Sequence, residues 1–211
     1  MQVSNLFNPS PEKHVYSKPS FLKKAAALFN PLGFLSPYTV RAKVVLQEIW
    51  ASGVVWDEPV SVNLSLKASR WFEEICALVK IRIPRCMRTP AAVKEVILHT
   101  FVDSFQEAYG AVSYFRHVYE DETISFRLGV SRSRVAPLQT ISIPLLELIA
   151  AILGLKLSQT VGQKLGIKKE KWSFWSDRFD VLYWIRGQSW RSKPFVRNRV
   201  SEIQALTDPE Q

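Results

Sequence analysis

Apolar and polar residues follow two different periods along the chain, and the change falls near its middle. Before residue 85 apolar residues recur at helical spacing, which predicts one helix that starts at Pro37 and a second over 64–80. After residue 93 the apolar runs are short and rich in β-branched and aromatic side chains, which is typical of strands. The predicted strands cover 96–102, 111–119 and 123–130. We place a domain boundary between these two patterns, near 85–93.

Helical spacing returns after the three strands. Pro144 can open an apolar helix that reaches about Leu165, and a short buried strand follows over 171–176. Two further helices are expected at 180–186 and 195–206. This order of elements, with a sheet covered by helices, predicts an α/β layered domain that contains a three-stranded meander. The expected parts of the chain are a poorly ordered lead-in (1–24), a helical region (25–90) and the α/β domain (91–211).

The composition is typical of a globular protein, because 47% of the residues are hydrophobic, with twelve Phe and seven Trp. The first 24 residues contain no apolar segment of the kind found in secretory signals, and the apolar run 141–155 is too short to span a bilayer. We therefore expect an intracellular protein, cytoplasmic or alternatively nuclear, that does not bind membranes. Trp71, Trp172 and Trp175 are expected in the core, whereas an exposed Trp190 could stack on a nucleic-acid base.

The cysteines and histidines do not form a recognisable site. Cys76 and Cys86 have no Cys or His neighbour at the spacing of zinc ligands, so we expect both to be reduced and buried. His99 and His117 fall in predicted strands and have no Ser or Cys partner in a known motif. No Asp-Thr-Gly or Asp-Ser-Gly loop occurs either, so nothing in the sequence supports a protease.

Three acidic residues stand where acids are rare. Asp103 is expected to end the first strand, Asp177 follows the fourth strand, and Glu147 is the only charged residue in the apolar run 141–155. Two strand ends and one helix face can converge on a single point, where a divalent cation would offset the repulsion between carboxylates. Such oxygen ligands suit Mg²⁺ or Mn²⁺. The alternative for each acid taken singly is a salt bridge or a helix cap.

Positive charge is concentrated in the second half of the chain. The net charge is +9, and residues 123–200 contain fourteen Lys and Arg but four Asp and Glu. A basic surface around a small acidic site is what an enzyme acting on a polyanion needs. The alternative is a basic face that is simply exposed to solvent.

Several stretches make the chain similar to Pao/BEL retrotransposon polyproteins from about Phe21 onward. They are LFNPLGFLSP (28–37), FVDSFQEAYGAV (101–112), SRVAPL (133–138), IPLLEL (143–148), SDRFDVLYWI (176–185) and FVRNRV (195–200). In these polyproteins the first stretch leads from the polymerase thumb into an RNase H domain. The resemblance therefore implies a reverse transcriptase thumb or connection region at 25–90 and an RNase H-like domain at 91–211.

By this resemblance, Asp103, Glu147 and Asp177 correspond to the first three of four carboxylates that hold Mg²⁺ or Mn²⁺ in an RNase H-type site. The implied reaction is two-metal hydrolysis of RNA in an RNA–DNA hybrid, with Asp103 bridging both ions. The implied partners are the hybrid and the rest of the retroelement polyprotein, including its polymerase and integrase. The basic residues that we expect to bind phosphates are Arg132, Arg134, Lys193, Arg197 and Arg199.

The chain departs from the family pattern beside the carboxylates. Residues 104–105 (Ser-Phe) stand where the family has Ala-Ser, Leu145 replaces an Arg, and Arg178 replaces a Ser. Arg178 is expected to lie beside Asp177 and to compete with a divalent ion. The chain also ends at Gln211, before the family segment that supplies the fourth carboxylate. We therefore expect a truncated RNase H-like domain with weakened or vestigial cleavage.

Two functions remain open from the sequence. The first is an RNase H-type endonuclease, intact or vestigial, and the second is a non-catalytic nucleic-acid-binding module derived from a retroelement. Whether the chain is an enzyme is left undecided by these residues. The distances among the three carboxylates distinguish the two functions, because a shared metal site requires their oxygens to lie close together.

Overall fold

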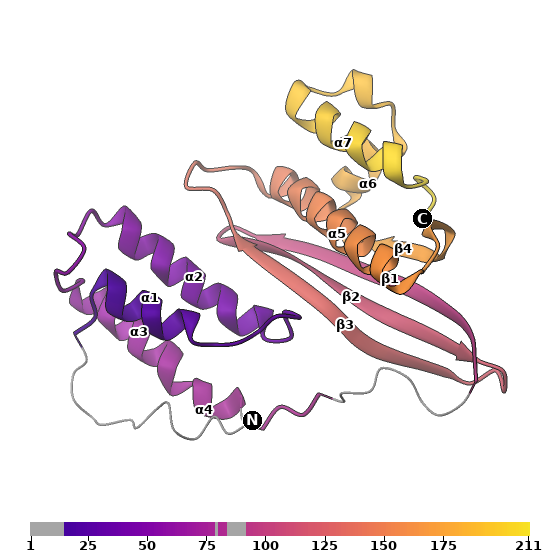
Figure 1. Cartoon of the computed structure of the whole chain (residues 1–211). Helices are drawn as coiled ribbons and strands as arrows, with labels where there is room; N and C mark the ends of the chain where they lie inside the picture. The colour runs from indigo at the N-terminus through magenta and orange to yellow at the C-terminus, as the bar shows by residue number, and fades with distance from the viewer. Residues whose placement is uncertain (1–14, 79, 84–91) are drawn as a thin grey trace. The chain divides into compact units, whose positions relative to one another are not determined.

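The chain folds into two compact units (Figure 1). The computed structural model describes residues 15–78, 80–83 and 92–211. Among these, 15–29 and 37–83 form the first unit, and 30–36 and 92–211 form the second. The short segment 30–36 therefore belongs to the second unit although its neighbours in sequence belong to the first.

The first unit is helical in its described residues. Its helices are α1 Lys18–Ala26, α2 Ser36–Ala51, α3 Val62–Glu73 and α4 Ile75–Leu78. Their apolar faces share one core, in which Phe21, Ile49 and Trp71 are almost fully buried. The Tyr38 hydroxyl donates to the Trp71 carbonyl, and the indole N–H of Trp71 donates to the Tyr38 carbonyl over 2.9 Å. These reciprocal bonds fix α2 against α3.

The predicted disorder of the lead-in is wrong for its last residues. Helix α1 begins at Lys18, with Ser17 in a capping box and Pro19 in the first turn, where proline is well tolerated. Phe21 anchors this helix because its side chain is completely buried. Residues 1–14 of the lead-in, and most of the interdomain linker around Cys86, lie outside the described residues.

The second unit contains a four-stranded sheet with the order β3-β2-β1-β4. Its strands are β1 Val93–Phe105, β2 Ala108–Tyr119, β3 Ile124–Val135 and β4 Trp172–Trp175. The first three strands pair antiparallel, whereas β4 runs parallel to β1. The predicted layered α/β architecture, with a meander followed by a helix, a strand and further helices, is confirmed.

The strands of the meander are longer than the sequence predicts. β1 continues past Asp103 to Phe105, β2 begins at Ala108 instead of Ala111, and β3 ends at Val135 instead of Val130. The added residues include Ser, Gly and Arg, which weaken a hydrophobic strand pattern. They are nevertheless held in register by backbone pairing across the hairpins.

Helix α5, Ile143–Leu165, crosses the sheet antiparallel to β1. Glu147 near its start meets Ser104, and Ser158 near its end meets Thr100. Between them the helix comes very close to the sheet, since a Cβ on Gly154 would lie 2.5 Å from a Val102 methyl group. This direction places the start of α5 beside the end of β1.

Helices α6 Phe179–Arg186 and α7 Pro194–Leu206 pack against one flank of α5 and against Phe174 of β4 (Figure 1). Leu148 and Leu155 of α5 share a core with Val181 and Val200 of these helices. Helix α5 is therefore apolar over its sheet-facing side and over the flank that meets α6 and α7, whereas Lys156, Thr160 and Gln163 on the remaining face are exposed.

Among the described helices, α5 alone has the length and composition of a membrane span, and 56% of that stretch is buried inside the protein. Burial of this kind is expected of a central core helix.

Two single-residue predictions are wrong. Trp71 and Trp172 are buried as predicted, but Trp175 is half exposed because residues of β4 alternate between the two faces of the sheet. Trp175 stacks on Phe101 and donates to Nδ1 of His99 over 3.1 Å. Cys76 is exposed rather than buried, because its neighbour Ile75 occupies the core-facing position of the short helix α4.

Candidate metal centre

The parallel pairing of β1 and β4 brings two carboxylates to the same edge of the sheet. Phe101 of β1 lies opposite Trp175 of β4 at the last paired position. Asp103 and Asp177 each follow two residues later, so equal steps along parallel strands place them side by side. Functional residues of sheets with parallel strands commonly gather at this carboxyl edge.

Helix α5 supplies the third carboxylate from above the sheet. Glu147 lies just beyond the first turn of the helix, and its side chain is almost completely buried. One carboxylate oxygen, Oε1, accepts a hydrogen bond of 3.1 Å from the backbone N–H of Ser104. The carboxylate is thus tied to the residue directly after Asp103.

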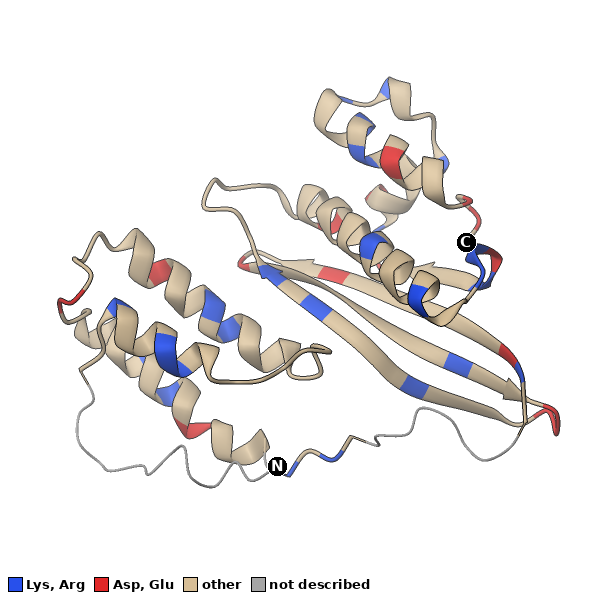
Figure 2. Cartoon of the chain, viewed as in Figure 1, with Lys and Arg blue, Asp and Glu red and all other residues tan. Residues whose placement is uncertain are grey.

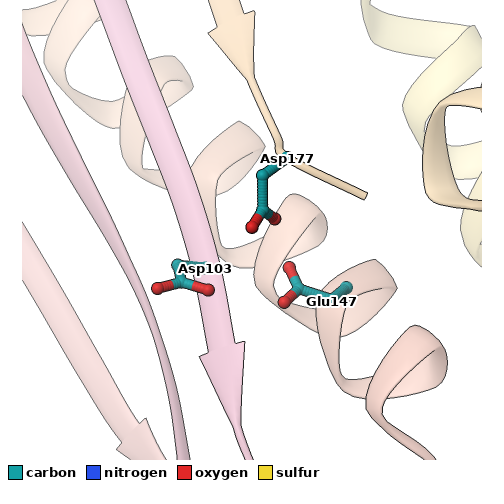
Figure 3. Close-up of side chains that lie close together, drawn as sticks. All are labelled: Asp103, Glu147 and Asp177. Atoms are coloured by element: carbon teal, nitrogen blue, oxygen red, sulfur yellow. The ribbon is translucent and has the colours of Figure 1, made fainter. Parts of the chain in front are cut away.

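The three carboxylates point toward one another (Figure 3). One oxygen from each of Asp103, Glu147 and Asp177 lies within 4.8 Å of the others. Two oxygens bound to the same Mg²⁺ ion lie between about 3 and 4.2 Å apart, so small side-chain movements would let ions bind between these carboxylates. The three-oxygen set therefore fits Mg²⁺ or Mn²⁺ well.

Glu147 carries the strongest indication that a cation belongs here. Its second oxygen, Oε2, is buried and accepts no hydrogen bond from the described residues. Burial raises the pKa of the Glu147 carboxyl above its ordinary value of about 4.5, the hydrogen bond from Ser104 opposes this, and the charges of Asp103 and Asp177 raise it further. A buried carboxylate with an unbonded oxygen is stabilised by a proton, a hydrogen-bond donor or a cation.

Arg178 approaches this cluster in a way that the sequence did not reveal. It was expected beside Asp177, but its Nε atom lies 3.8 Å from Oε1 of Glu147. The Arg178 side chain is 46% exposed, so water screens part of this attraction. The guanidinium is nevertheless the cation nearest to the buried carboxylate among the ion pairs of the described residues.

The basic residues selected from the sequence do not gather at one place. Arg132 and Arg134 lie exposed on β3, while Lys193 precedes α7 and Arg197 and Arg199 lie within it. The Arg199 guanidinium lies over the Phe195 ring at 3.4 Å and donates to the Phe195 carbonyl. Figure 2 likewise shows Lys and Arg spread over the sheet and the helices of the second unit.

A groove next to the carboxylates was missed by the sequence prediction. It has a volume of about 1050 Å³ and lies between the start of α5, helix α6 and the start of α7. Phe179 and Tyr183 line it and are 86% and 79% exposed. Arg191 and Lys193 also line it. Its cationic lining and exposed rings are the features with which proteins hold nucleic-acid strands.

A sequence signal for this groove did exist. Val181, Trp184 and Ile185 form the core-facing stripe of α6, at helical spacing. That stripe leaves Phe179 and Tyr183 on the opposite face, one turn apart, directly after Asp177. Two aromatic residues on a solvent-facing helical stripe beside a candidate carboxylate indicate a binding surface.

Comparison with known proteins gives one family. The family model described as "Pao retrotransposon-like RNaseH-like domain" matches residues 17–178, which is most of the chain and includes all three carboxylates. No curated protein matches the sequence.

The raised pKa of Glu147 makes a prediction for stability without metal. The folded state binds the Glu147 proton more tightly than the unfolded chain does. The protonated carboxyl therefore stabilises the fold fully below about pH 4.5, and this stabilisation is lost as the pH rises through the raised pKa. With EDTA present, Glu147→Gln should be more stable than the wild type at neutral pH, and the difference should shrink at acidic pH. Urea unfolding between about pH 4 and pH 8 measures this difference.

The matched control is Glu107→Gln, which neutralises an exposed carboxylate in the hairpin between β1 and β2 and should show no such trend. A lower free energy of unfolding for Glu147→Gln at neutral pH would contradict the account of a destabilising buried charge.

Proposed function

Because the chain belongs to the Pao retrotransposon-like RNaseH-like domain family, we propose that its second unit hydrolyses RNA in RNA–DNA hybrids with the help of divalent metal ions. The observation that carries this proposal is the convergence of Asp103, Glu147 and Asp177, with a buried and unbonded oxygen on Glu147. As in retroelement polyproteins, polymerase and integrase regions are the partners that we propose for the rest of the parent protein.

Asp103, Glu147 and Asp177 would hold the divalent ions. Bound Mg²⁺ or Mn²⁺ would supply an activated water and stabilise the leaving 3′ oxygen. The protein's own contribution is positioning. The Ser104 N–H fixes the Glu147 carboxylate, and the parallel pairing of β1 with β4 fixes Asp103 and Asp177.

The substrate would lie in the groove beside this centre. Arg191 and Lys193 would bind phosphates, and Phe179 and Tyr183 would pack against exposed sugars or bases. All four side chains come from segments that follow Asp177 in sequence. Recognition of RNA would use its 2′-hydroxyl groups.

We also propose that cleavage by this chain is weak. Arg178 places a positive charge within 3.8 Å of Glu147, the ligand that most needs a cation. The same observation favours the second candidate function, a non-catalytic module that binds hybrids through the groove and the basic residues of β3 and α7.

Cleavage of a labelled RNA–DNA hybrid tests the proposal directly. The wild-type chain should cleave slowly with Mg²⁺ or Mn²⁺ and not at all with EDTA. Asp103→Asn should abolish the reaction, since it removes one of the three carboxylates that would hold the ions. Asp180→Asn, which changes an exposed acid in the first turn of α6, is the matched control and should retain activity. Hybrid binding without any metal-dependent cleavage would favour the non-catalytic module instead.

Arg178→Ser should strengthen metal binding. Removing a cation near Glu147 lowers the electrostatic cost of placing a divalent ion there, and we expect a gain on the order of tenfold in Mn²⁺ affinity, equal to about 1.4 kcal/mol. Arg178→Lys keeps the charge and should bind Mn²⁺ like the wild type. Titration calorimetry measures the Mn²⁺ affinity of all three proteins. Equal Mn²⁺ affinities of Arg178→Ser and the wild type would refute competition between Arg178 and the ion.

Hybrid binding should depend on salt through the groove. Replacing Arg191 and Lys193 by Ala removes two phosphate contacts, so the slope of log affinity against log salt should fall by about 1.8. The control replaces Lys164 and Lys168, which lie at the opposite end of α5 and carry the same charge. Fluorescence anisotropy with a hybrid at several salt concentrations gives the slopes. If both double variants give the wild-type slope, hybrids do not bind in this groove.

A further inference from the structure

The segment Asn30–Ser36 interrupts the first unit and folds with the second. It is part of the motif LFNPLGFLSP, to which the proposed nuclease function assigns no role. The segment is internally ordered by two turns. Gly33 N–H donates to the Asn30 carbonyl over 3.2 Å, Ser36 N–H donates to the Gly33 carbonyl over 2.8 Å, and Asn30 Oδ1 accepts from Leu35 N–H over 3.1 Å.

This segment lies against β3, a strand with one open edge. In the described sheet, β3 pairs only with β2, so no other described strand pairs with its second edge. The N–H of Ser131 donates to the Leu32 carbonyl over 2.8 Å, and the Ser131 hydroxyl donates to the Gly33 carbonyl. Two residues later, the Ser133 hydroxyl is 3.5 Å from the Ser36 carbonyl, at the limit of a hydrogen bond.

Gly33 makes this close approach possible. Its φ of +75° is a left-handed conformation that other residues adopt at a cost. A Cβ at this position would lie 1.8 Å from the Ser131 carbonyl oxygen and 2.6 Å from its carbon. Both are backbone atoms of β3, which cannot move aside as a flexible side chain could. Any residue with a side chain at position 33 therefore separates the segment from the strand.

We propose that the Asn30–Ser36 segment is a strap that the open edge of β3 recognises through its backbone, and that the Asn-Pro-Leu-Gly sequence exists to form it. The occupant of this edge is thus the chain's own peptide, held as in strand addition but through one backbone bond and a side-chain bond. Arg132 and Arg134 alternate with Ser131 and Ser133 along β3. The strap therefore also steadies the stretch of strand that presents these two exposed arginines.

Gly53 and Gly166 provide matched controls for a test by substitution. Their φ values, +73° and +67°, are close to that of Gly33, but a Cβ at either position would meet no atom within 4 Å. Gly33→Ala, Gly53→Ala and Gly166→Ala consequently share the backbone cost of a left-handed alanine. Only Gly33→Ala adds the collision with Ser131. A difference in hydrogen exchange between Gly33→Ala and the two control variants therefore measures the contact between the strap and β3.

Amide hydrogen exchange in the full chain measures that difference. In the wild type and both control variants the Ser131 amide should be protected, and in Gly33→Ala it should exchange at least about tenfold faster. Ser131→Ala removes only the hydroxyl bond. Hydrogen exchange at the Leu35 and Ser36 amides should therefore accelerate less in this variant than in Gly33→Ala. Rapid exchange of Ser131 in the wild type, or equal exchange in Gly33→Ala and the controls, would overturn the proposal.

The exchange experiment uses neither metal nor nucleic acid, so its outcome is independent of the proposed nuclease function. Hybrid affinity tests the second part of the inference. Gly33→Ala should bind a hybrid more weakly than Gly53→Ala does, because Arg132 and Arg134 lose their support. Equal affinities of these two variants would show that the strap does not position the arginines.

Discussion

The second unit depends on one buried contact, the hydrogen bond from the Ser104 N–H to the carboxylate of Glu147. A charged group in a core requires compensation, and here the sheet supplies a single donor for it. This bond holds the start of α5 beside the end of β1, the bond between Ser158 and Thr100 holds its later turns, and Gly154 permits the close approach to the sheet. The apolar layers on both sides of α5 then hold the helix in that position. The carboxylate that is least favourable for folding thus determines where the helix lies.

Placing three carboxylates close together lowers the stability of the fold. Asp103 and Asp177 are exposed and can be solvated, whereas Glu147 cannot, so the repulsion among the three acids falls mainly on Glu147. Arg178 relieves part of this cost, but from a distance of 3.8 Å and with half of its side chain in water. A partner of this kind leaves Oε2 unbonded. The site therefore remains attractive to a cation that can enter the cluster, and Arg178 reduces that attraction without removing it.

The sequence predicted the three carboxylates because each is an acid in apolar surroundings, and local context alone reveals that contrast. The sequence-based prediction was wrong for features that depend on which strands pair in the folded sheet. Trp175 resembles a core residue in sequence, but its exposure follows from the alternation of β4 and from a face that no helix of the second unit covers in the described structure. Asp103 was placed at the end of β1, yet pairing with β2 extends the strand to Phe105. Arg178 was expected beside Asp177, and the sequence did not show that it would also approach Glu147 on α5.

The strap on β3 shows the same limit over a longer range. Helical periodicity assigns residues 25–90 to one region. This assignment is correct for residues that pack against others nearby in the sequence. Leu32 and Ser131, however, are joined by a backbone bond across about a hundred residues, and backbone bonds leave no mark on the pattern of side chains. The local trace of this contact is Gly33, because a glycine between turn residues signals a left-handed backbone. That signal predicts a turn but not its partner. Membership in a folding unit is therefore decided by the strand edge that the turn meets, a property of the folded sheet rather than of the segment itself.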